Sequence, residues 1–424
     1  MFLSLGVSYA FVAAQPAPEA DIHEMEVRKI IDYLASDSLK GRGNGRPELL
    51  QAGRFIGDEF KKYGLKPIPG RSSYYLPFRP FGGSKKIVSD ILEWNGKKLG
   101  SDEFMYFHPG PGNYTPKKLE DFTVIKVDSF FTQDILEKYG SVKTDILLWS
   151  NLPQPDLENY FPPLIDMPNG GLSSNILLVC TPQPPTHIAL SGVASYYSNL
   201  QYNVVAMLPG RSKPNEIVAF SAHYDHEGVF RRGRKKDSIM NGANDNASGT
   251  TALLVLARHF AQAADNERTL LFCAFSGEEL GLLGSKAFVE EIETDSIVAN
   301  INIEMIAVPQ YGRNDIFITG AAESELPAIL EKNLRKHQMR IKPGPSEEKL
   351  LYRRSDNFSF AKKGVPAHSI MSSDDDDKCY HQPCDDLDRV DVAHMTAVIK
   401  GIIAATKTLV NGEERPKRIA KGRE

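Results

Sequence analysis

Residues 203–209 (NVVAMLP) and 216–223 (EIVAFSAH) open a stretch in which short apolar runs alternate with helical segments. The stretch continues with a long helix from Ser248 to about Ala264, the run TLLFCAFS at 269–276, a helix through Leu280 to Glu291, and the run IVANINIEM at 297–305. Apolar strands that alternate with helices are typical of a mixed, mostly parallel sheet that helices cover on both faces. We therefore predict an α/β fold whose functional residues lie beyond the carboxyl ends of the strands.

Side chains that bind metals occur where the predicted strands end. His223 ends the second run and Asp225 follows it, Glu278 and Glu279 follow the third run, and Glu304 lies near the end of the fourth. Zinc accepts imidazole nitrogen and carboxylate oxygen as ligands, and a catalytic zinc site combines three protein ligands with an open position for water. The agreement between residue type and position predicts a metal site at this edge of the sheet.

A further carboxylate comes from the segment MNGANDNASGT at 240–250. Its small residues allow a tight turn, which places Asp245 just ahead of the long helix that begins near Ser248. A carboxylate shared by two metal ions holds them about 3.5–4 Å apart. Asp245 is the best candidate for that bridge, and a later histidine would complete the ligand set.

The order of these motifs resembles the dizinc exopeptidase family of bacterial leucyl aminopeptidase, aminopeptidase Y and glutamate carboxypeptidase. The resemblance covers about residues 202–410 and rests on five motifs, which are His-x-Asp, GANDNASG, GEELGLLGS, NIEM and a distal histidine. It implies the zinc exopeptidase fold, two zinc ions per chain, and hydrolysis of the first peptide bond of a peptide substrate.

The family's residue roles transfer to matching positions of this sequence. They imply that His223 and Glu304 bind the first zinc, that Asp225 orients His223, and that Asp245 bridges. Glu279 and His381 bind the second zinc, with His381 in the segment DKCYHQPCDDLD at 377–388, and Glu278 is the general base. The family usually has an aspartate where this chain has Glu304, and the extra methylene could change how many of its oxygens bind.

One further motif departs from the family pattern. Ser355 and Asp356 resemble the start of a Ser-Asp-His element, but Asn357 replaces the histidine. Tyr352 lies three positions before the serine, where the bacterial aminopeptidases have a tyrosine that hydrogen-bonds the developing oxyanion. Such a donor stabilises the transition state by roughly 3 kcal/mol, so Tyr352 is a candidate catalytic residue.

Other functions on the same fold stay open. A carboxypeptidase needs arginines that bind a terminal carboxylate, and Arg353 and Arg354 lie near the site in sequence. A glutaminyl cyclase would work with one zinc. This sequence retains His223 and Glu304, which argues against the loss of one metal site. A non-catalytic binding protein on a peptidase scaffold usually loses ligands or the base, whereas Glu278 is present here.

The remaining chain divides by composition. Residues 1–14 are apolar, end in small residues and are typical of a signal peptide, which implies a secreted or periplasmic protein. Residues 15–65 contain two predicted helices and join residues 200–410 in the catalytic domain. Residues 66–199 form a β-rich lobe that resembles a protease-associated insert in position, and 411–424 form a polar tail that we expect to fray.

Charge and cysteine content limit the partners. A net charge of −4 gives no basic field for nucleic acid or for an anionic membrane, and no other apolar run is long enough to span a bilayer. Cys379 and Cys384 are a possible local disulfide, with two ordinary thiols as the alternative. His226 and His259 match no motif, and His259 is expected to face solvent. Oligomeric state does not follow from the sequence.

Overall fold

The computed structural model describes residues 21–78, 84–100, 103–107, 112–113, 116–127, 139, 142–151, 174–197, 200–229, 238–345 and 348–422. The signal peptide predicted for residues 1–14 lies outside these residues. Within the described part of the chain, no helix combines the length and apolar character needed to cross a bilayer.

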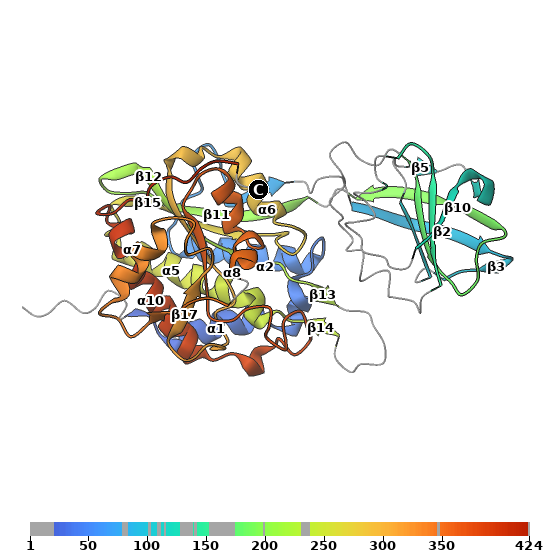
Figure 1. Cartoon of the computed structure of the whole chain (residues 1–424). Coiled ribbons are helices and arrows are strands. Elements are labelled where there is room, and N and C mark those ends of the chain that lie inside the picture. Colours follow the sequence, from blue (N-terminus) through green and yellow to red (C-terminus); the bar gives the residue numbers. More distant parts are fainter. Residues whose placement is uncertain are drawn as a thin grey trace, which may run out of the picture.

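An eight-stranded sheet forms the centre of the larger body (Figure 1), in the order β1, β11, β15, β12, β16, β19, β17, β18. The strands are β1 (Tyr75–Phe78), β11 (Gln201–Leu208), β12 (Lys213–His223), β15 (Arg268–Phe275), β16 (Ile297–Ile303), β17 (Asp315–Ile318), β18 (Arg340–Ile341) and β19 (Ala367–Met371). The four strands β15, β12, β16 and β19 are parallel neighbours, while β1, β11 and β17 pair antiparallel. The predicted mixed α/β sheet is confirmed.

Helices cover both faces of this sheet because alternate residues of each strand point to opposite sides. In β12, Val218 and Phe220 pack in a core with α1, α2, α5 and α10, whereas Ala219 packs with residues of α6 and α9. The helices are α1 (Glu24–Leu34), α2 (Pro47–Lys62), α5 (Gly249–Ala263), α6 (Leu283–Glu291), α7 (Leu326–Leu334), α8 (Glu348–Arg353), α9 (Asn357–Lys362) and α10 (Val392–Val410).

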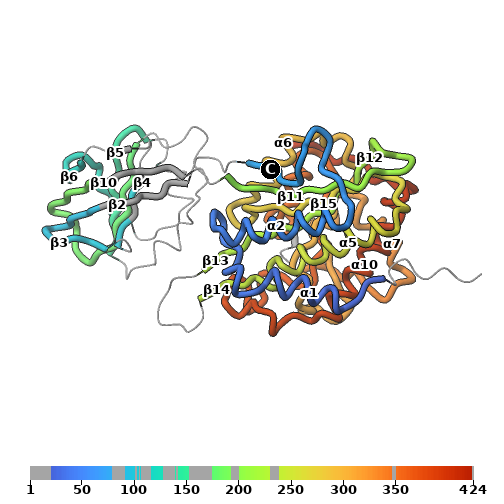
Figure 2. The backbone as a smooth tube through the Cα atoms, turned by 180° about the vertical axis from the view of Figure 1, so that it is seen from behind, coloured from blue at the N-terminus to red at the C-terminus, as the bar shows by residue number. Residues whose placement is uncertain are grey.

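A smaller group of strands lies apart from the eight-stranded sheet, as Figures 1 and 2 show from opposite sides. They are β2 (Ser84–Trp94), β3 (Lys97–Lys98), β4 (Phe104–Phe107), β5 (Gly112–Asn113), β6 (Lys117–Lys118), β7 (Thr123–Lys126), β8 (Ile146–Ser150), β9 (Ile176–Cys180) and β10 (Ile188–Tyr197). They form one five-stranded and one four-stranded sheet around a core that includes Trp94, Leu147 and Leu177. Because β1 pairs with β11, residues 75–78 belong to the central sheet rather than to the lobe.

The C-terminal segment packs on the larger body. Arg418 Nη1 donates to the carbonyl of Thr294 at 2.9 Å, and the Ile419 N–H donates to the carbonyl of Gly364 at 3.1 Å. The expectation that this tail frays is therefore wrong for the described residues up to 422, because backbone and side-chain hydrogen bonds fix it.

Candidate metal centre

The central parallel strands bring the predicted side chains together at one edge of the sheet. β12 ends at His223, β16 ends one residue before Glu304, and the turn after β15 carries Glu278 and Glu279. Among the described residues, three overlapping groups have ligand atoms that all lie within 4.8 Å of one another. The first group is His223, Asp245 and Glu304, the second is His226, Asp245, Glu279 and His381, and a third joins His223 to Glu278 and Glu279. All five predicted metal ligands therefore lie in one centre.

The first group is almost fully buried. His223 Nε2 lies 3.2 Å from Asp245 Oδ1 and 3.0 Å from Glu304 Oε1. The second oxygen of Glu304 accepts a hydrogen bond from Ser355 Oγ at 2.6 Å. Glu304 therefore directs one oxygen toward His223 and has the other engaged, an arrangement that favours monodentate binding despite the longer side chain.

The second group uses the other oxygen of the same aspartate. His381 Nε2 lies 3.2 Å from Asp245 Oδ2 and 3.2 Å from Glu279 Oε2. Asp245 thus presents Oδ1 to one imidazole and Oδ2 to another, as a carboxylate between two ions must.

The donor atoms fit zinc. Ligand atoms that surround one tetrahedral zinc at about 2.0–2.1 Å lie about 3.3 Å from each other, close to the separations in both groups. Each group also brings carboxylates together in a buried place, where burial without a compensating cation is costly. The residues present are therefore suited to hold two zinc ions.

Hydrogen bonds with two buried charged side chains, Asp385 and Arg42, hold the turn that carries Asp245. The Asp385 carboxylate accepts hydrogen bonds from the backbone N–H groups of Asn244 at 2.9 Å and Asp245 at 3.0 Å. Burial raises the pKa of Asp385 to about 6. Arg42, fully buried, donates to the carbonyls of Asn241 at 2.6 Å and Gly242 at 2.9 Å. These bonds fix the backbone from Asn241 to Asp245, the residue predicted to bridge two metal ions.

Asp225 is fully buried but differs in detail from its predicted role. Its nearest carboxylate oxygen lies 3.6 Å from His223 Nδ1, beyond hydrogen-bond distance, and the backbone carbonyl of Asp225 lies closer, at 3.2 Å. The carboxylate instead accepts from the N–H groups of Glu278 at 3.3 Å and Glu279 at 3.4 Å, and from Asn44 Nδ2 at 2.7 Å. Asp225 thus links the His223 strand to the glutamate pair.

Glu278 lies beside the ligands as a base should. Its side chain is 11% exposed, and Oε2 lies 4.0 Å from His223 Nε2. Burial raises the pKa of its carboxyl well above the usual range. A carboxylate that is poorly solvated and adjacent to the metal ligands is suited to accept a proton.

Tyr352 contacts aromatic rings and backbone groups. Its ring packs against Phe358 and His368 at centroid distances of 5.8 and 5.5 Å, and its side chain fills the space above Gly320. Asn357, which replaces the family's histidine, donates to the carbonyl of Tyr352 at 3.0 Å. None of these contacts joins Tyr352 to a metal ligand, so its oxyanion role stays a prediction.

Two histidines occupy places that the sequence interpretation did not assign. His226 is 1% exposed and its Nδ1 lies 2.7 Å from Glu279 Oε1. Its position three residues after His223, at the same strand end, is the sequence signal for it. His259 is 4% exposed and pairs with Asp21 at 2.8 Å, so the prediction that it faces solvent is wrong, because the N-terminal segment covers this side of α5.

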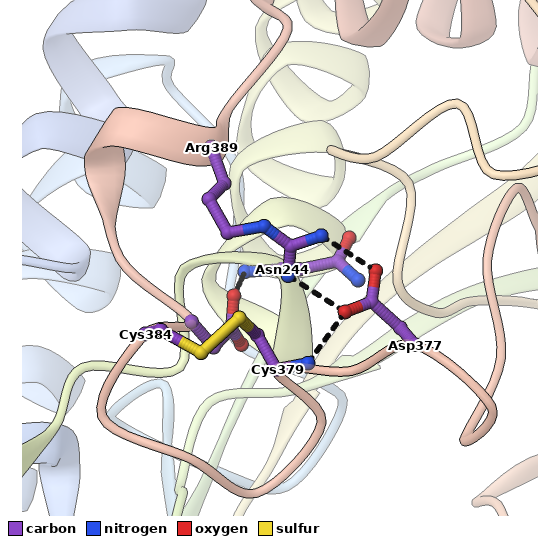
Figure 3. Close-up of a disulfide and its surroundings, with 6 residues drawn as sticks. Asn244, Asp377, Cys379, Cys384 and Arg389 are labelled. Carbon is purple, nitrogen blue, oxygen red and sulfur yellow. Dashed lines mark hydrogen bonds and ion pairs between the residues drawn. A yellow bond between two sulfur atoms is a disulfide. The ribbon is translucent and has the colours of Figure 1, made fainter.

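Cys379 and Cys384 form a disulfide (Figure 3), and the predicted ligand His381 lies between them in the sequence. The loop is further fixed by Arg389, whose guanidinium bonds both oxygens of Asp377 at 2.6 and 2.8 Å. The open question between a local disulfide and two thiols is thus decided in favour of the disulfide.

Residues 203–406 match the model of peptidase family M28. This segment is an M28 peptidase domain. The family predicted from the strand-end motifs is confirmed, and the matched range begins in β11 and ends in α10, so it contains every predicted metal ligand.

Similar curated proteins match about half of this chain or less. Aminopeptidase Y of Saccharomyces cerevisiae is 26% identical over 231 residues, which cover 49% of this chain and 42% of that protein. Leucine aminopeptidase 2 of Trichophyton equinum is 28% identical over 194 residues, covering 42% and 38%. The matched regions therefore span less than half the length of these relatives.

Similar solved structures extend over nearly the whole chain and show the fold. The zinc aminopeptidase BSAP of Bacillus subtilis aligns with a TM-score of 0.63 at 15% identity, covering 92% of this chain and 95% of that chain. A glutaminyl cyclase from an Acidobacteriales bacterium aligns with a TM-score of 0.51 at 15% identity, covering 96% and 100%. The architecture alone is thus compatible with more than one reaction.

Proposed function

We propose that this chain is a two-zinc aminopeptidase that removes the first residue from peptides. The observation that carries the proposal is Asp245, whose two oxygens each lie 3.2 Å from a different imidazole, with Glu278 beside the same centre. Names of matched relatives support it, since they include aminopeptidase Y and a leucine aminopeptidase.

Different side chains of the site have different roles in the proposed hydrolysis. Two zinc ions held by the five ligands would supply the positive charge that polarises the scissile carbonyl and acidifies a water. Glu278 accepts the proton of the attacking water and then delivers it to the leaving amine. Asp225 keeps Glu278 in place by accepting the hydrogen bond of its backbone N–H. Removal of Glu278 should therefore abolish turnover without emptying the metal sites.

Charges around the centre favour a free amino terminus over a free carboxylate. Glu227 lies 3.5 Å from His381 Nδ1 with 44% of its side chain exposed, so a carboxylate is available beside the site to an α-ammonium group. Of the arginines that a carboxypeptidase would need, Arg354 is paired with Asp375, and Arg353 lies over the ring of Phe358. Neither guanidinium is left without a partner among the described residues.

One observation argues against each of the other two functions, a glutaminyl cyclase and a non-catalytic binding protein. A one-zinc cyclase would not require the second set formed by Asp245, Glu279 and His381. A non-catalytic binding protein would not require Glu278 at the edge of the ligands. The structural likeness to a glutaminyl cyclase reflects the shared fold.

Apolar first residues are the preferred substrates in this proposal. Met305 follows the ligand Glu304 and forms a small apolar cluster with Phe317, Leu351 and Met371, against which Tyr380 packs. The side chains of the cluster itself are at most 7% exposed, so they support the ligand from the core and do not themselves form an open pocket. The preference for leucine rests on the name of the Trichophyton relative.

We also propose that residues 1–14 direct export, that the mature enzyme acts in a secreted or periplasmic setting, and that the strands of β2–β10 form a lobe inserted into the catalytic domain. The disulfide supports an oxidising environment, because such bonds persist mainly outside the cytosol.

The test is hydrolysis of aminoacyl-p-nitroanilides and of matched amino-blocked peptides by zinc-loaded protein, with a chelator control and the Glu278→Gln variant. The proposal predicts chelator-sensitive release from free-amine substrates, leucine ahead of charged residues, and two zinc ions per chain by elemental analysis. Glu278→Gln should keep both ions and lose at least about 1,000-fold in kcat. Cleavage from the carboxyl end would reassign the chain to a carboxypeptidase, and one ion with cyclase activity would reject the proposal.

A further inference from the structure

Glu304 and Glu279, the carboxylates that each belong to only one of the two proposed zinc sites, make the same pattern of contacts. Glu304 directs Oε1 toward His223, while Ser355 Oγ donates to its Oε2 at 2.6 Å. Glu279 directs Oε2 toward His381 at 3.2 Å, while His226 Nδ1 lies 2.7 Å from its Oε1. In each carboxylate, one oxygen faces the partner imidazole and the other is engaged by a neighbouring side chain.

His226 is placed rigidly for this contact. It is 1% exposed, and a Cβ atom on Gly242 would lie only 2.4 Å from its Cδ2. The loop at Gly242 has φ of +57°, a conformation that suits glycine, so the ring packs directly on the backbone of the turn that carries Asp245. A change of ring plane would collide with that turn.

The ring is suited to donate through Nδ1. Its distance of 2.7 Å from a carboxylate oxygen requires a proton between the two atoms, and the proton belongs on the imidazole when Glu279 serves as a ligand. Nε2 has no hydrogen-bond partner among the described residues. A neutral ring with Nδ1–H satisfies the short contact and leaves no buried N–H without an acceptor.

Geometry argues against His226 as a direct ligand. Its Nδ1 lies 3.9 Å from Asp245 Oδ2, whereas His381 Nε2 lies 3.2 Å from an oxygen of Asp245 and 3.2 Å from an oxygen of Glu279. His226 Nδ1 is closest to Glu279 Oε1, while the other oxygen of that carboxylate faces His381. His226 therefore contacts the oxygen of Glu279 that does not face His381.

We infer that His226 is a positioning residue that donates Nδ1–H to Glu279 Oε1, holds that carboxylate monodentate, and thereby sets the affinity and coordination of the second metal site. The inference rests on the proposed two-metal function and deepens it. Groups that orient metal ligands in this way typically contribute about 10–100-fold to metal affinity. The effect should be confined to the site of Glu279 and His381.

Three substitutions separate this role from others. In His226→Asn the amide nitrogen takes the place of Nδ1, so the donor is kept. In His226→Gln the amide nitrogen takes the place of Nε2, and in His226→Leu the donor is removed. All three are compared with wild type by thermal unfolding of the metal-free protein, which reports folding independently of metal.

The readouts are zinc affinity by chelator competition and the visible spectrum of the Co²⁺-substituted protein. We expect His226→Leu and His226→Gln to lower the affinity for one of the two zinc ions about 10-fold or more and to change the Co²⁺ spectrum. The zinc affinity of His226→Asn should stay within about threefold of the wild-type value. Unchanged zinc affinity and spectrum in His226→Leu would overturn the inference. Loss in His226→Asn equal to that in His226→Leu, with a lower coordination number, would also overturn it and make His226 a ligand. Fewer than two zinc ions in wild type would reject the proposed function instead.

Discussion

The carboxylate of Asp385 accepts the backbone N–H of Asp245 at 3.0 Å, and so a residue 140 positions away holds the backbone of the bridging ligand. The same carboxylate accepts from Asn244 through its other oxygen. Both oxygens are thus committed to the turn. An amide could replace only one of the two hydrogen bonds, because its nitrogen would face the other N–H group.

Asp385→Asn should therefore weaken the centre although it preserves shape. Loss of one buried, charge-assisted hydrogen bond costs about 1.5–3 kcal/mol. We expect a lower free energy of unfolding of the metal-free protein by that amount, and weaker binding of both zinc ions, since Asp245 belongs to both groups. Asp386→Asn is the matched control, because its side chain accepts from the N–H of Leu387, away from the turn. Equal effects of the two variants in denaturant titrations would contradict this account.

Ser355 should act on the first metal site alone. Its hydroxyl donates to Glu304 Oε2 and is absent in Ser355→Ala, which frees Glu304 to turn or to bind through both oxygens. We expect one zinc ion to bind about 10-fold more weakly in chelator competition, while the other is unchanged. Ser359→Ala, which removes a buried hydroxyl bonded to Ser285, controls for packing and stability. An equal loss in both variants would show that Ser355 serves the fold rather than Glu304.

The sequence predicts the sheet and three of the candidate ligands, His223, Glu279 and Glu304, for one physical reason, whereas Asp245 is predicted from the turn before a helix and His381 from the family resemblance. Parallel strands end at the same edge, so metal-binding side chains at successive strand ends, such as His223 and Glu304, must meet there. The same logic applies to His226, which follows the same strand. The family's motif positions do not include His226, which the sequence interpretation therefore leaves out, although its Nδ1 lies 2.7 Å from Glu279 Oε1 in the structure.

Other features depend on packing that periodicity does not encode. Tyr352 lies on α8, and where its ring points depends on how that short helix packs against Phe358 and His368. The pairing of Cys379 with Cys384 requires the loop to bring two Cα atoms to 5.3 Å. The paired β1 strand at Tyr75–Phe78 carries a proline, which weakens a strand pattern, and so the sequence pattern begins the lobe too early.

Reduction of the disulfide should loosen the second metal site. Cys384 is exposed, and the bond closes the loop that contains His381. We expect a phosphine reductant to lower the affinity of one zinc ion and the activity, because His381 then samples more conformations. The Cys379→Ala/Cys384→Ala double variant should show the weaker affinity already and should not respond to the reductant, since Cys180 and Cys273 are buried thiols. A reductant effect that persists in the double variant would exclude the disulfide as its cause.

Acid should destabilise the metal-free fold through His368, a buried histidine of β19. Its Nδ1 lies 2.7 Å from the carbonyl of Thr319 and its Nε2 lies 2.6 Å from Ser324 Oγ. Burial lowers the pKa of His368 from its ordinary value of 6.5 to about 4. The neutral ring is thus favoured in the folded protein.

Because the folded pKa lies below the unfolded pKa, this contribution is fully present above pH 6.5 and is lost as the pH falls toward 4, where the unfolded chain binds the extra proton. The loss approaches about 3 kcal/mol at pH 4. We expect the free energy of unfolding of chelated wild type to fall more steeply between pH 6.5 and pH 4 than that of His368→Gln, which has no titrating ring. Parallel pH profiles in urea titrations would show that His368 titrates normally in the folded state.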